Sequence, residues 1–325
     1  MSLSVCRDLD DLRAGLERWL GRSVGSIERP TPGWSCETLI VEDVLVIRLP
    51  PLSAGIFPSY DLEQQAAVQN AVGAAGVPVA GPARYEPDAA FLGDPFVAMP
   101  FVAGRIPGEF TPADGWLLSL PNDAARRSLW HSFLAAVGAI HGTDHRGLGL
   151  RAGLAAELDY WDHYLLWATE AAPPPALAEA LGWCRANRPK VEPAPSLLWG
   201  DVRLGNVIFA ADTPTPLAVI DWDMASVGPA EMDVGWFLAL ETLQTTLTGL
   251  SMPGFGTHSD AVAALERGIA RPLADLAWYE VFALVRASAI STRIARLFQA
   301  AGQASPFRVG EDPTLAAALA RIERA

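Results

Sequence analysis

The chain has 325 residues, half of them hydrophobic and 19% charged, which is enough apolar side chain for a sizeable core and excludes wholesale disorder. Its 24 basic and 37 acidic residues leave a formal net charge of −13, so it is a poor general binder of nucleic acid or of anionic membrane. Lys190 is the only lysine, so any phosphate chemistry here must use arginine, backbone N–H groups or metal.

The first hundred residues predict a small, strand-rich lobe. Leucine and tryptophan recur at helical spacing near the N-terminus. Further on, two short apolar runs flank Glu42 and Asp43, a pattern typical of a hairpin. In chain order we expect a helix at 8–20, strands at 36–41 and 44–49, a helix at 61–75, and strands around 83–86 and 95–99.

From Gly104 onward the pattern becomes helical. About 150 residues per domain gives roughly two domains or lobes for this length. We place the hinge at 99–104, which predicts an N-lobe of residues 1–103 and a C-lobe of residues 104–325, in an α+β fold. The expected C-lobe elements are helices at 123–141, 154–170, 176–187, 230–243, 258–270, 272–301 and 313–323, with short strands at 206–209 and 217–221.

The segment 197–223 carries the residues that point to chemistry. One apolar run leads into Asp201, Asn206 follows five positions later, and a second apolar run ends at Asp221. Asp and Asn oxygens suit a hard cation such as magnesium, and a further carboxylate can position a hydroxyl, as phosphoryl transfer requires. Each residue alone is also typical of a turn or cap, but the three together favour the catalytic interpretation.

The motifs GDVRLGN (200–206) and IDWD (220–223) resemble those of the aminoglycoside phosphotransferase/choline kinase-like family, whose members are relatives of the protein kinases. More specifically, the chain is similar to the phosphotransferase-like domains found beside, or fused to, acyl-CoA dehydrogenases. The resemblance extends from about Gly33 to the helices after Asp233. It implies a protein-kinase-like two-lobed fold with a small β-rich N-lobe and a larger, mainly helical C-lobe.

The resemblance also implies roles for four residues in the C-lobe. Asp201 corresponds to the catalytic base, and Asn206 and Asp221 correspond to the magnesium ligands. Asp233 corresponds to a helix-borne aspartate that supports the catalytic loop, a role that is compatible with its other interpretation as an N-terminal helix cap.

The nucleotide-binding cation departs from the family pattern. The strand VLVIR puts Arg48 where the family has lysine; arginine keeps the charge and binds phosphate bidentately. Glu63, early in the next helix, resembles the family's ion-pair partner for that cation. The alternatives are a solvated strand-end arginine and an ordinary first-turn helix acid. A second departure is Trp199, which stands where the family has histidine before Gly-Asp; that histidine mainly packs and hydrogen-bonds.

Two further segments resemble parts of a nucleotide site. The stretch TPGWS (31–35) stands where the family has its phosphate-covering loop, with Gly33 permitting close backbone approach and Ser35 offering a hydroxyl and an N–H. A plain turn is the alternative. The hinge resembles an adenine-binding segment, in which the carbonyl of Pro100 and the N–H of Val102 are free to serve because proline lacks only the N–H.

Several other polar residues receive structural interpretations. His141 closes a helix before a glycine, so a C-terminal cap role is expected. Glu157, Asp159 and Asp162 are expected on a solvated helix face, with contact to a substrate as the alternative. The aromatic residues of the same helix recur at helical spacing and predict core packing.

We therefore predict that the chain transfers the γ-phosphoryl group of ATP to a hydroxyl of a small molecule, with magnesium. A nucleotide-binding module that has lost transfer, as in a pseudokinase, is an alternative suggested by Trp199 and Arg48; the intact Asp201, Asn206 and Asp221 argue against it. A structural partner of an acyl-CoA-processing enzyme has no direct support among the residues.

The acceptor is less defined by the sequence. The helices after Asp233 hold few charges, whereas an aminoglycoside site needs several carboxylates, so the chain is not expected to be an efficient aminoglycoside kinase. The resemblance implies a hydroxyacyl-type acceptor and a functional link to acyl-CoA metabolism.

Cysteine usage and hydropathy predict the compartment. The three cysteines show no paired spacing, so neither a disulfide framework nor a zinc cluster is expected. No apolar run reaches the ~18 residues of a spanning helix, and the N-terminus lacks a signal pattern. These features predict a soluble, cytoplasmic protein.

Overall fold

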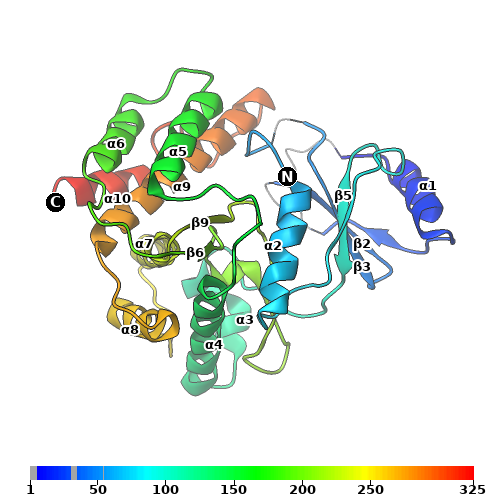
Figure 1. The fold of residues 1–325 in the computed structure, drawn as a ribbon, viewed down its shortest axis with the longest axis horizontal. Coiled ribbons are helices and arrows are strands. Elements are labelled where there is room, and N and C mark those ends of the chain that lie inside the picture. The colour runs from blue at the N-terminus through cyan, green and yellow to red at the C-terminus, as the bar shows by residue number, and fades with distance from the viewer. Residues whose placement is uncertain (1–5, 31–34, 54) are drawn as a thin grey trace.

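The computed structural model describes residues 6–30, 35–53 and 55–325. Figure 1 shows a lobe built on an antiparallel sheet beside a larger lobe made mostly of helices. The predicted α+β class, with a small β-rich N-lobe and a helical C-lobe, is confirmed. The boundary between residues 103 and 104 stays a prediction.

The N-lobe contains a five-stranded antiparallel sheet in the order β1-β2-β3-β5-β4. Glu42, Asp43 and Val44 join β2 to β3; Glu42 and Asp43 have positive φ angles of 55° and 52°, as a tight type I′ turn requires. Asp8 and Asp61 cap the two helices of this lobe. The elements are α1 (Leu9–Leu20), β1 (Ile27–Glu28), β2 (Glu37–Val41), β3 (Leu45–Leu49), α2 (Leu62–Ala74), β4 (Arg84–Glu86) and β5 (Phe96–Pro100).

The alternation of side chains along β3 aims Arg48 at the space between the lobes. Successive strand residues point to opposite faces of a sheet. Ile47 is buried on one face with Leu12 and Leu16 of α1, whereas Val46 contacts the α2 side. Arg48 therefore shares the α2 side with Val46, and both line the cleft described below.

The C-lobe surrounds two small two-stranded sheets, β6 with β9 and β7 with β8. The short helix α3 was not predicted; the other helices lie within a few residues of their predicted ranges, apart from the end of α7. The elements are α3 (Gly115–Ser119), α4 (Asp123–His141), α5 (Leu154–Ala168), α6 (Pro175–Ala186), β6 (Pro195–Leu198), β7 (Val207–Phe209), β8 (Pro216–Val219), β9 (Ser226–Pro229), α7 (Glu231–Thr248), α8 (His258–Ile269), α9 (Leu276–Ala300) and α10 (Pro313–Ile322), with 3-10 turns at Thr111–Ala113 and Leu204–Asn206.

The sheet formed by β6 and β9 is absent from the sequence prediction. β9 contains Gly228 and Pro229, which disfavour a strand unless a partner holds it. The strand predicted to end at Asp221 ends instead at Val219. Asp221 has a left-handed φ of 66°, which no strand accommodates, so the chain turns at this carboxylate.

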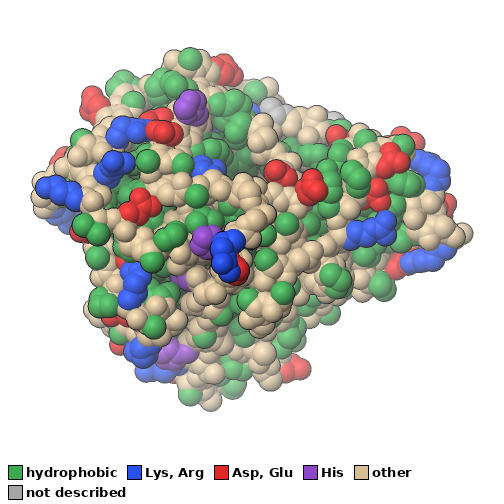
Figure 2. Space-filling model, viewed as in Figure 1, with side chains coloured by type: hydrophobic (Ala, Val, Ile, Leu, Met, Phe, Trp, Pro, Cys, Tyr) green, Lys and Arg blue, Asp and Glu red, His purple; other side chains and the backbone are tan. Residues whose placement is uncertain are grey.

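Close packing of α7 against α9 sets the position of the residues that α7 carries. A Cβ on Gly235 would lie 2.7 Å from the backbone carbon of Tyr279, so only glycine permits this approach. No helix among the described residues is long and apolar enough to cross a membrane. On the face shown in Figure 2, acidic and basic side chains are interspersed with hydrophobic ones.

Candidate active site

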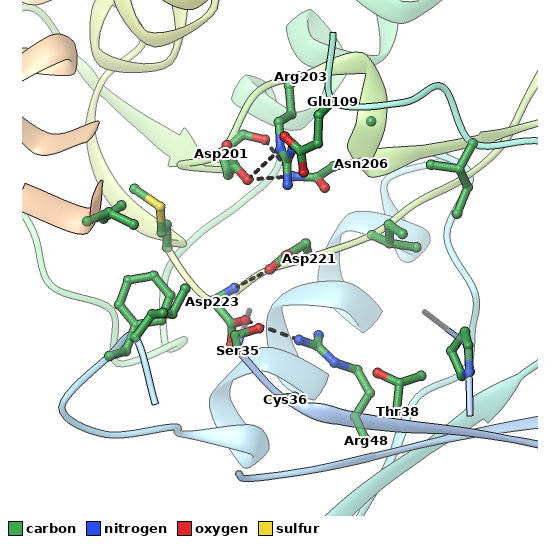
Figure 3. A pocket seen from close by; sticks show the side chains of 18 of the residues that line it. Ser35, Cys36, Thr38, Arg48, Glu109, Asp201, Arg203, Asn206, Asp221 and Asp223 are labelled. Atoms are coloured by element: carbon green, nitrogen blue, oxygen red, sulfur yellow. Dashed lines mark hydrogen bonds and ion pairs between the residues drawn. The ribbon is translucent and has the colours of Figure 1, made fainter. Parts of the chain in front are cut away.

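A cleft of about 1230 Å³ lies between the two lobes. Its walls come from β2, β3 and β5 of the N-lobe, from the segments that follow β6 and β8, and from α7 and α9. Figure 3 shows Asp201, Arg203, Glu109 and Asn206 gathered on one side, and Arg48 with Asp223 on the other. The side chain of Asp221 lies between these two groups.

Three N–H donors fix the carboxylate of Asp201 just after β6. Its Oδ2 accepts from Arg203 Nε at 2.9 Å and from Asn206 Nδ2 at 2.7 Å. Its Oδ1 accepts from the indole Nε1 of Trp236 at 2.9 Å. A carboxylate offers about four acceptor positions, so Oδ1 retains the capacity to accept from a further group in the cleft.

Asp233 accepts hydrogen bonds from the backbone of the loop that carries Asp201. Its Oδ1 accepts from Gly200 N at 2.9 Å, and its Oδ2 accepts from Trp199 N at 2.8 Å. It is 1% exposed and lies within α7, so the helix-cap interpretation is wrong, whereas the loop contacts agree with the supporting role. Because Gly200 has a φ of 92° and no Cβ, the loop can turn tightly against Met224.

His141 reaches the same buried carboxylate. It is the last residue of α4, and its Nε2 lies 3.0 Å from Asp233 Oδ2. The ring is buried, and the side chain does more than the predicted cap role implies. Through Asp233 it links α4 to the loop that carries Asp201. The sequence offered no sign of this contact beyond a single histidine at the end of an apolar helix.

Trp199 makes hydrogen bonds at the position where the family has histidine. Its indole Nε1 donates to the carbonyls of Ile220 at 3.0 Å and Asp221 at 2.9 Å. The ring is fully buried and lies 6.1 Å from the ring of Trp222. Trp199 thereby ties the loop of Asp201 to the segment of Asp221.

Asn206 and Asp221 offer oxygens to the centre of the cleft. The Nδ2 of Asn206 donates to the backbone and side-chain oxygens of Asp201, so its side-chain oxygen is left for another partner. Burial raises the pKa of Asp221 to about 7; Asp223 adds to the shift and Arg48 opposes it. A bound cation would offset the repulsion between the carboxylates of Asp221 and Asp223 and so favour the ionised form of Asp221.

The oxygen donors of Asn206 and Asp221 are of the kind that suits a hard cation such as magnesium. Within the described residues there is no cluster of three or more His, Cys, Asp or Glu side chains that could hold a metal alone. Magnesium prefers oxygen ligands and usually takes only one or two from protein, the rest coming from phosphates and water. Asn206 and Asp221 match that pattern.

The predicted ion pair between Arg48 and Glu63 is wrong. Arg48 Nη2 lies 3.1 Å from Asp223 Oδ2, and Gln65 of α2 donates to the other oxygen of Asp223. Glu63 is exposed. Residues two apart on a helix point about 200° apart, so when Gln65 faces the cleft Glu63 faces away from it.

A double-mutant cycle on the free energy of unfolding tests this partner exchange. Arg48→Ala and Asp223→Ala are expected to couple by about 0.5–3 kcal/mol, because each single change removes the same contact. Arg48→Ala and Glu63→Ala form the matched control cycle and are expected to add within about 0.5 kcal/mol. Urea denaturation supplies the four energies; coupling in the Glu63 cycle alone would restore the original assignment.

Besides Arg48 and Glu63, four residues are expected to bind nucleotide. Gly33 lies outside the described residues. Ser35 lines the cleft, and so do Pro100, at the end of β5, and Val102. Apolar side chains surround them: Ile40, Val46, Met99, Ile208 and Ile220. Such a lining suits a flat, apolar ring system, and the hydrogen-bonding roles of Pro100 and Val102 stay predictions.

The end of the cleft beyond Asp201 is mostly apolar. Spacings of three and four residues place these side chains on one face of each helix. Two carboxylates lie nearby: Glu109 accepts from Arg203 at 2.7 Å, and Asp312 caps α10 and accepts from Ser288 at 2.6 Å. The apolar lining consists of Trp236, Leu240, Leu243 and Leu247 from α7 and Ala287, Ile290 and Ile294 from α9.

Glu157 corrects another expectation. It was expected on a solvated face, but it is 1% exposed and accepts from Arg151 Nε at 2.6 Å and Trp161 Nε1 at 3.2 Å. Asp159 and Asp162 of the same helix are exposed and pair with Arg185. Local periodicity could not tell these acids apart, because the position of Arg151 depends on the tertiary fold.

Three residues that contact the site were not predicted from the sequence. Arg203 lies inside the catalytic-loop motif, at a position whose identity that motif leaves open. Glu109 comes from the segment after β5, and Trp236 from α7. The ring of Trp236 is held from behind by the buried guanidinium of Arg286, 4.9 Å from its centroid.

Comparison with known proteins adds family and fold. The model of the phosphotransferase enzyme family matches residues 26–265. Acyl-CoA dehydrogenase family member 11 of Gallus gallus is 28% identical over 221 residues, which cover 65% of this chain and 27% of that protein. The chain thus aligns with less than a third of the length of this curated relative.

Two solved structures share the fold over nearly the whole chain. A Ralstonia eutropha JMP134 protein, provisionally described as an aminoglycoside phosphotransferase, superposes with a TM-score of 0.69 at 20% identity, covering 96% of this chain and 98% of that one. The GDP complex of aminoglycoside 2′-phosphotransferase-IIIa gives a TM-score of 0.56 at 13% identity, covering 98% of both chains. The predicted protein-kinase-like fold is therefore confirmed.

Proposed function

The chain belongs to the phosphotransferase enzyme family, and from that premise we propose that it transfers the γ-phosphoryl group of ATP to a hydroxyl of a small molecule, with magnesium. The observation that carries the proposal is the convergence of Asp201, Asn206 and Asp221 on one cleft. Their chemistry supplies a positioned carboxylate and two metal-binding oxygens, the parts that phosphoryl transfer requires.

In this proposal Asp201 is the catalytic base. The acceptor hydroxyl donates to its Oδ1, which orients the oxygen and takes the proton as transfer proceeds. The bond between the acceptor oxygen and the γ-phosphorus forms while the bond from that phosphorus to the bridging oxygen breaks, and ADP leaves. Trp236 and Asn206 keep the carboxylate in one orientation throughout, so little of the rate depends on rearrangement.

The N-lobe residues hold the nucleotide. Arg48, kept in place by Asp223, would bind the phosphates as a charged fork. Gly33 and Ser35 would cover the phosphates, while the carbonyl of Pro100 and the N–H of Val102 would receive adenine. The GDP bound to the solved relative supports a purine nucleotide in this fold.

Asn206 and Asp221 would hold the magnesium ion. When bound, magnesium neutralises charge on the phosphate oxygens and so favours attack at phosphorus. The raised pKa of Asp221 supports this role, since a carboxylate that is costly to ionise alone gains most from a cation.

The direct test is magnesium-dependent release of ADP in the presence of a panel of small alcohols. We expect turnover by the wild-type chain that EDTA abolishes and excess magnesium restores. Absence of turnover with every alcohol, together with tight ATP binding, would instead favour a nucleotide-binding module without transfer.

The acceptor we propose is a partly apolar alcohol. The apolar faces of α7 and α9 line the end of the cleft where the acceptor would lie. The acyl-CoA dehydrogenase relative adds a functional link to acyl-CoA metabolism and a hydroxyacyl-type acceptor to this proposal. These remain proposals for the chain, because the match covers 27% of that relative.

Antibiotic resistance provides a test of this acceptor class. Expression in a susceptible host is expected to give no protection against kanamycin-type or gentamicin-type drugs. Tight binding of such polycations takes several free carboxylates. Of the two acids that line this region, Asp312 is buried and paired, which leaves Glu109 alone. Growth is measured across drug concentrations beside an Asp201→Asn strain; strong protection lost in that strain would overturn the prediction.

A further inference from the structure

Few basic side chains line the cleft, and their positions indicate which of them can reach a transferring phosphoryl group. The only lysine, Lys190, is exposed and is not among the residues that line the cleft. The arginines that line the cleft are Arg29, Arg48 and Arg203. Arg29 pairs with Glu37 and Arg48 with Asp223, both on the N-lobe side, whereas Arg203 lies beside the proposed base.

Arg203 is held between two carboxylates. Its Nε lies 2.9 Å from Asp201 Oδ2, and its Nη1 lies 2.7 Å from Glu109 Oε2. A guanidinium has five N–H donors in a rigid plane, so these two contacts leave others unused. Although burial works against the charge, Asp201 and Glu109 raise the pKa of Arg203, which keeps it a permanent cation.

The contact with Glu109 costs little to give up. The side chain of Glu109 is 65% exposed, and that of Arg203 is 28% exposed. Exposed ion pairs contribute about 0–1 kcal/mol because water competes for both charges. Arg203 can therefore exchange Glu109 for a more highly charged partner that enters the cleft.

We infer that Arg203 is a catalytic residue whose guanidinium contacts the phosphoryl group during transfer, an inference that rests on the proposed function. The acceptor oxygen must lie at Asp201, and the phosphorus must lie in line with that oxygen. A cation within hydrogen-bond distance of the same carboxylate is therefore next to the transferring group. Arg203 donates N–H bonds to the phosphoryl oxygens and gives up no proton, so the proton from the acceptor still goes to Asp201.

A purely positioning role for Arg203 makes a different prediction. If Arg203 served only to orient Asp201, its removal would lower kcat through the position of that carboxylate. It would leave the binding of a phosphoryl mimic unchanged. If Arg203 contacts the phosphoryl group, its removal weakens the binding of the mimic.

The experiment compares Arg203→Ala and Arg203→Lys with wild type, and Arg185→Ala serves as control because that arginine pairs with acids of α5 away from the cleft. Calorimetry measures binding of magnesium–ADP with and without aluminium fluoride, which mimics the transferring phosphoryl group. Wild type and Arg185→Ala are expected to bind ADP more tightly with the fluoride. Arg203→Ala is expected to bind ADP normally but to lose that gain, and Arg203→Lys to keep part of it.

Kinetics complete the test. Arg203→Ala is expected to lose about 10²-fold in kcat with little change in KM for ATP, as removal of one transition-state donor does. Full tightening by fluoride in Arg203→Ala would overturn the inference and leave the proposed function standing. Absence of ATP turnover and of fluoride tightening in the wild type would overturn the proposed function as well.

Discussion

Replacing Asp201 with asparagine is expected to lower kcat for phosphoryl transfer by about 10²–10⁴-fold, the usual worth of a positioned general base. Asparagine keeps the shape of the side chain but cannot take the acceptor's proton. The nucleotide is held by other residues in our proposal, so affinity for magnesium–ATP should change little. Steady-state ADP release and calorimetric binding of ATP measure the two quantities separately.

Asp212→Asn is the matched control for this prediction, because it makes the same charge change at an exposed position in the turn between β7 and β8. It should behave as wild type in both assays. Turnover by Asp201→Asn at the wild-type rate, with the true acceptor present, would show that Asp201 is not the base. Loss of ATP binding in that variant would place Asp201 in the nucleotide site instead.

Asp233→Ala is expected to cost about 3–5 kcal/mol in the free energy of unfolding. The change leaves the buried N–H groups of Trp199 and Gly200 without an acceptor, and it removes the partner of His141. Each buried donor left unpaired costs about 1–3 kcal/mol. The loop that carries Asp201 also loses its support, so kcat should fall in whatever fraction remains folded.

Urea denaturation measures the free energy of unfolding. Asp233→Asn is expected to lose less than Asp233→Ala, because its one side-chain oxygen can still accept from Trp199 or Gly200. Asp159→Ala, on the exposed side of α5, is the control and should change stability by less than about 0.5 kcal/mol. A loss below 1 kcal/mol in Asp233→Ala would mean that these hydrogen bonds do not anchor the loop.

Features that depend on interactions between residues close in sequence were predicted correctly, whereas features that depend on distant pairing were not. Glu42 and Asp43 between two apolar runs predicted a hairpin, because a tight turn is determined by its own backbone preferences. The helices were found for the same reason, since apolar periodicity is a local signal. The strand β9 was missed, because Gly228 and Pro229 are extended only through pairing with β6.

The fold class and the grouping of Asp201, Asn206 and Asp221 were predictable from the sequence alone, because their motifs lie within one short segment of the chain. Only the tertiary structure decided which partner each charged side chain takes. Trp236 meets Asp201 across 35 residues, His141 meets Asp233 across 92, Glu109 meets Arg203 across 94, and Asp223 meets Arg48 across 175. No local pattern specifies such pairs, because a side chain binds whichever partner the folded chain brings within about 3 Å. The exchange of Glu63 for Asp223 follows from this, since α2 turns Gln65 rather than Glu63 toward the cleft.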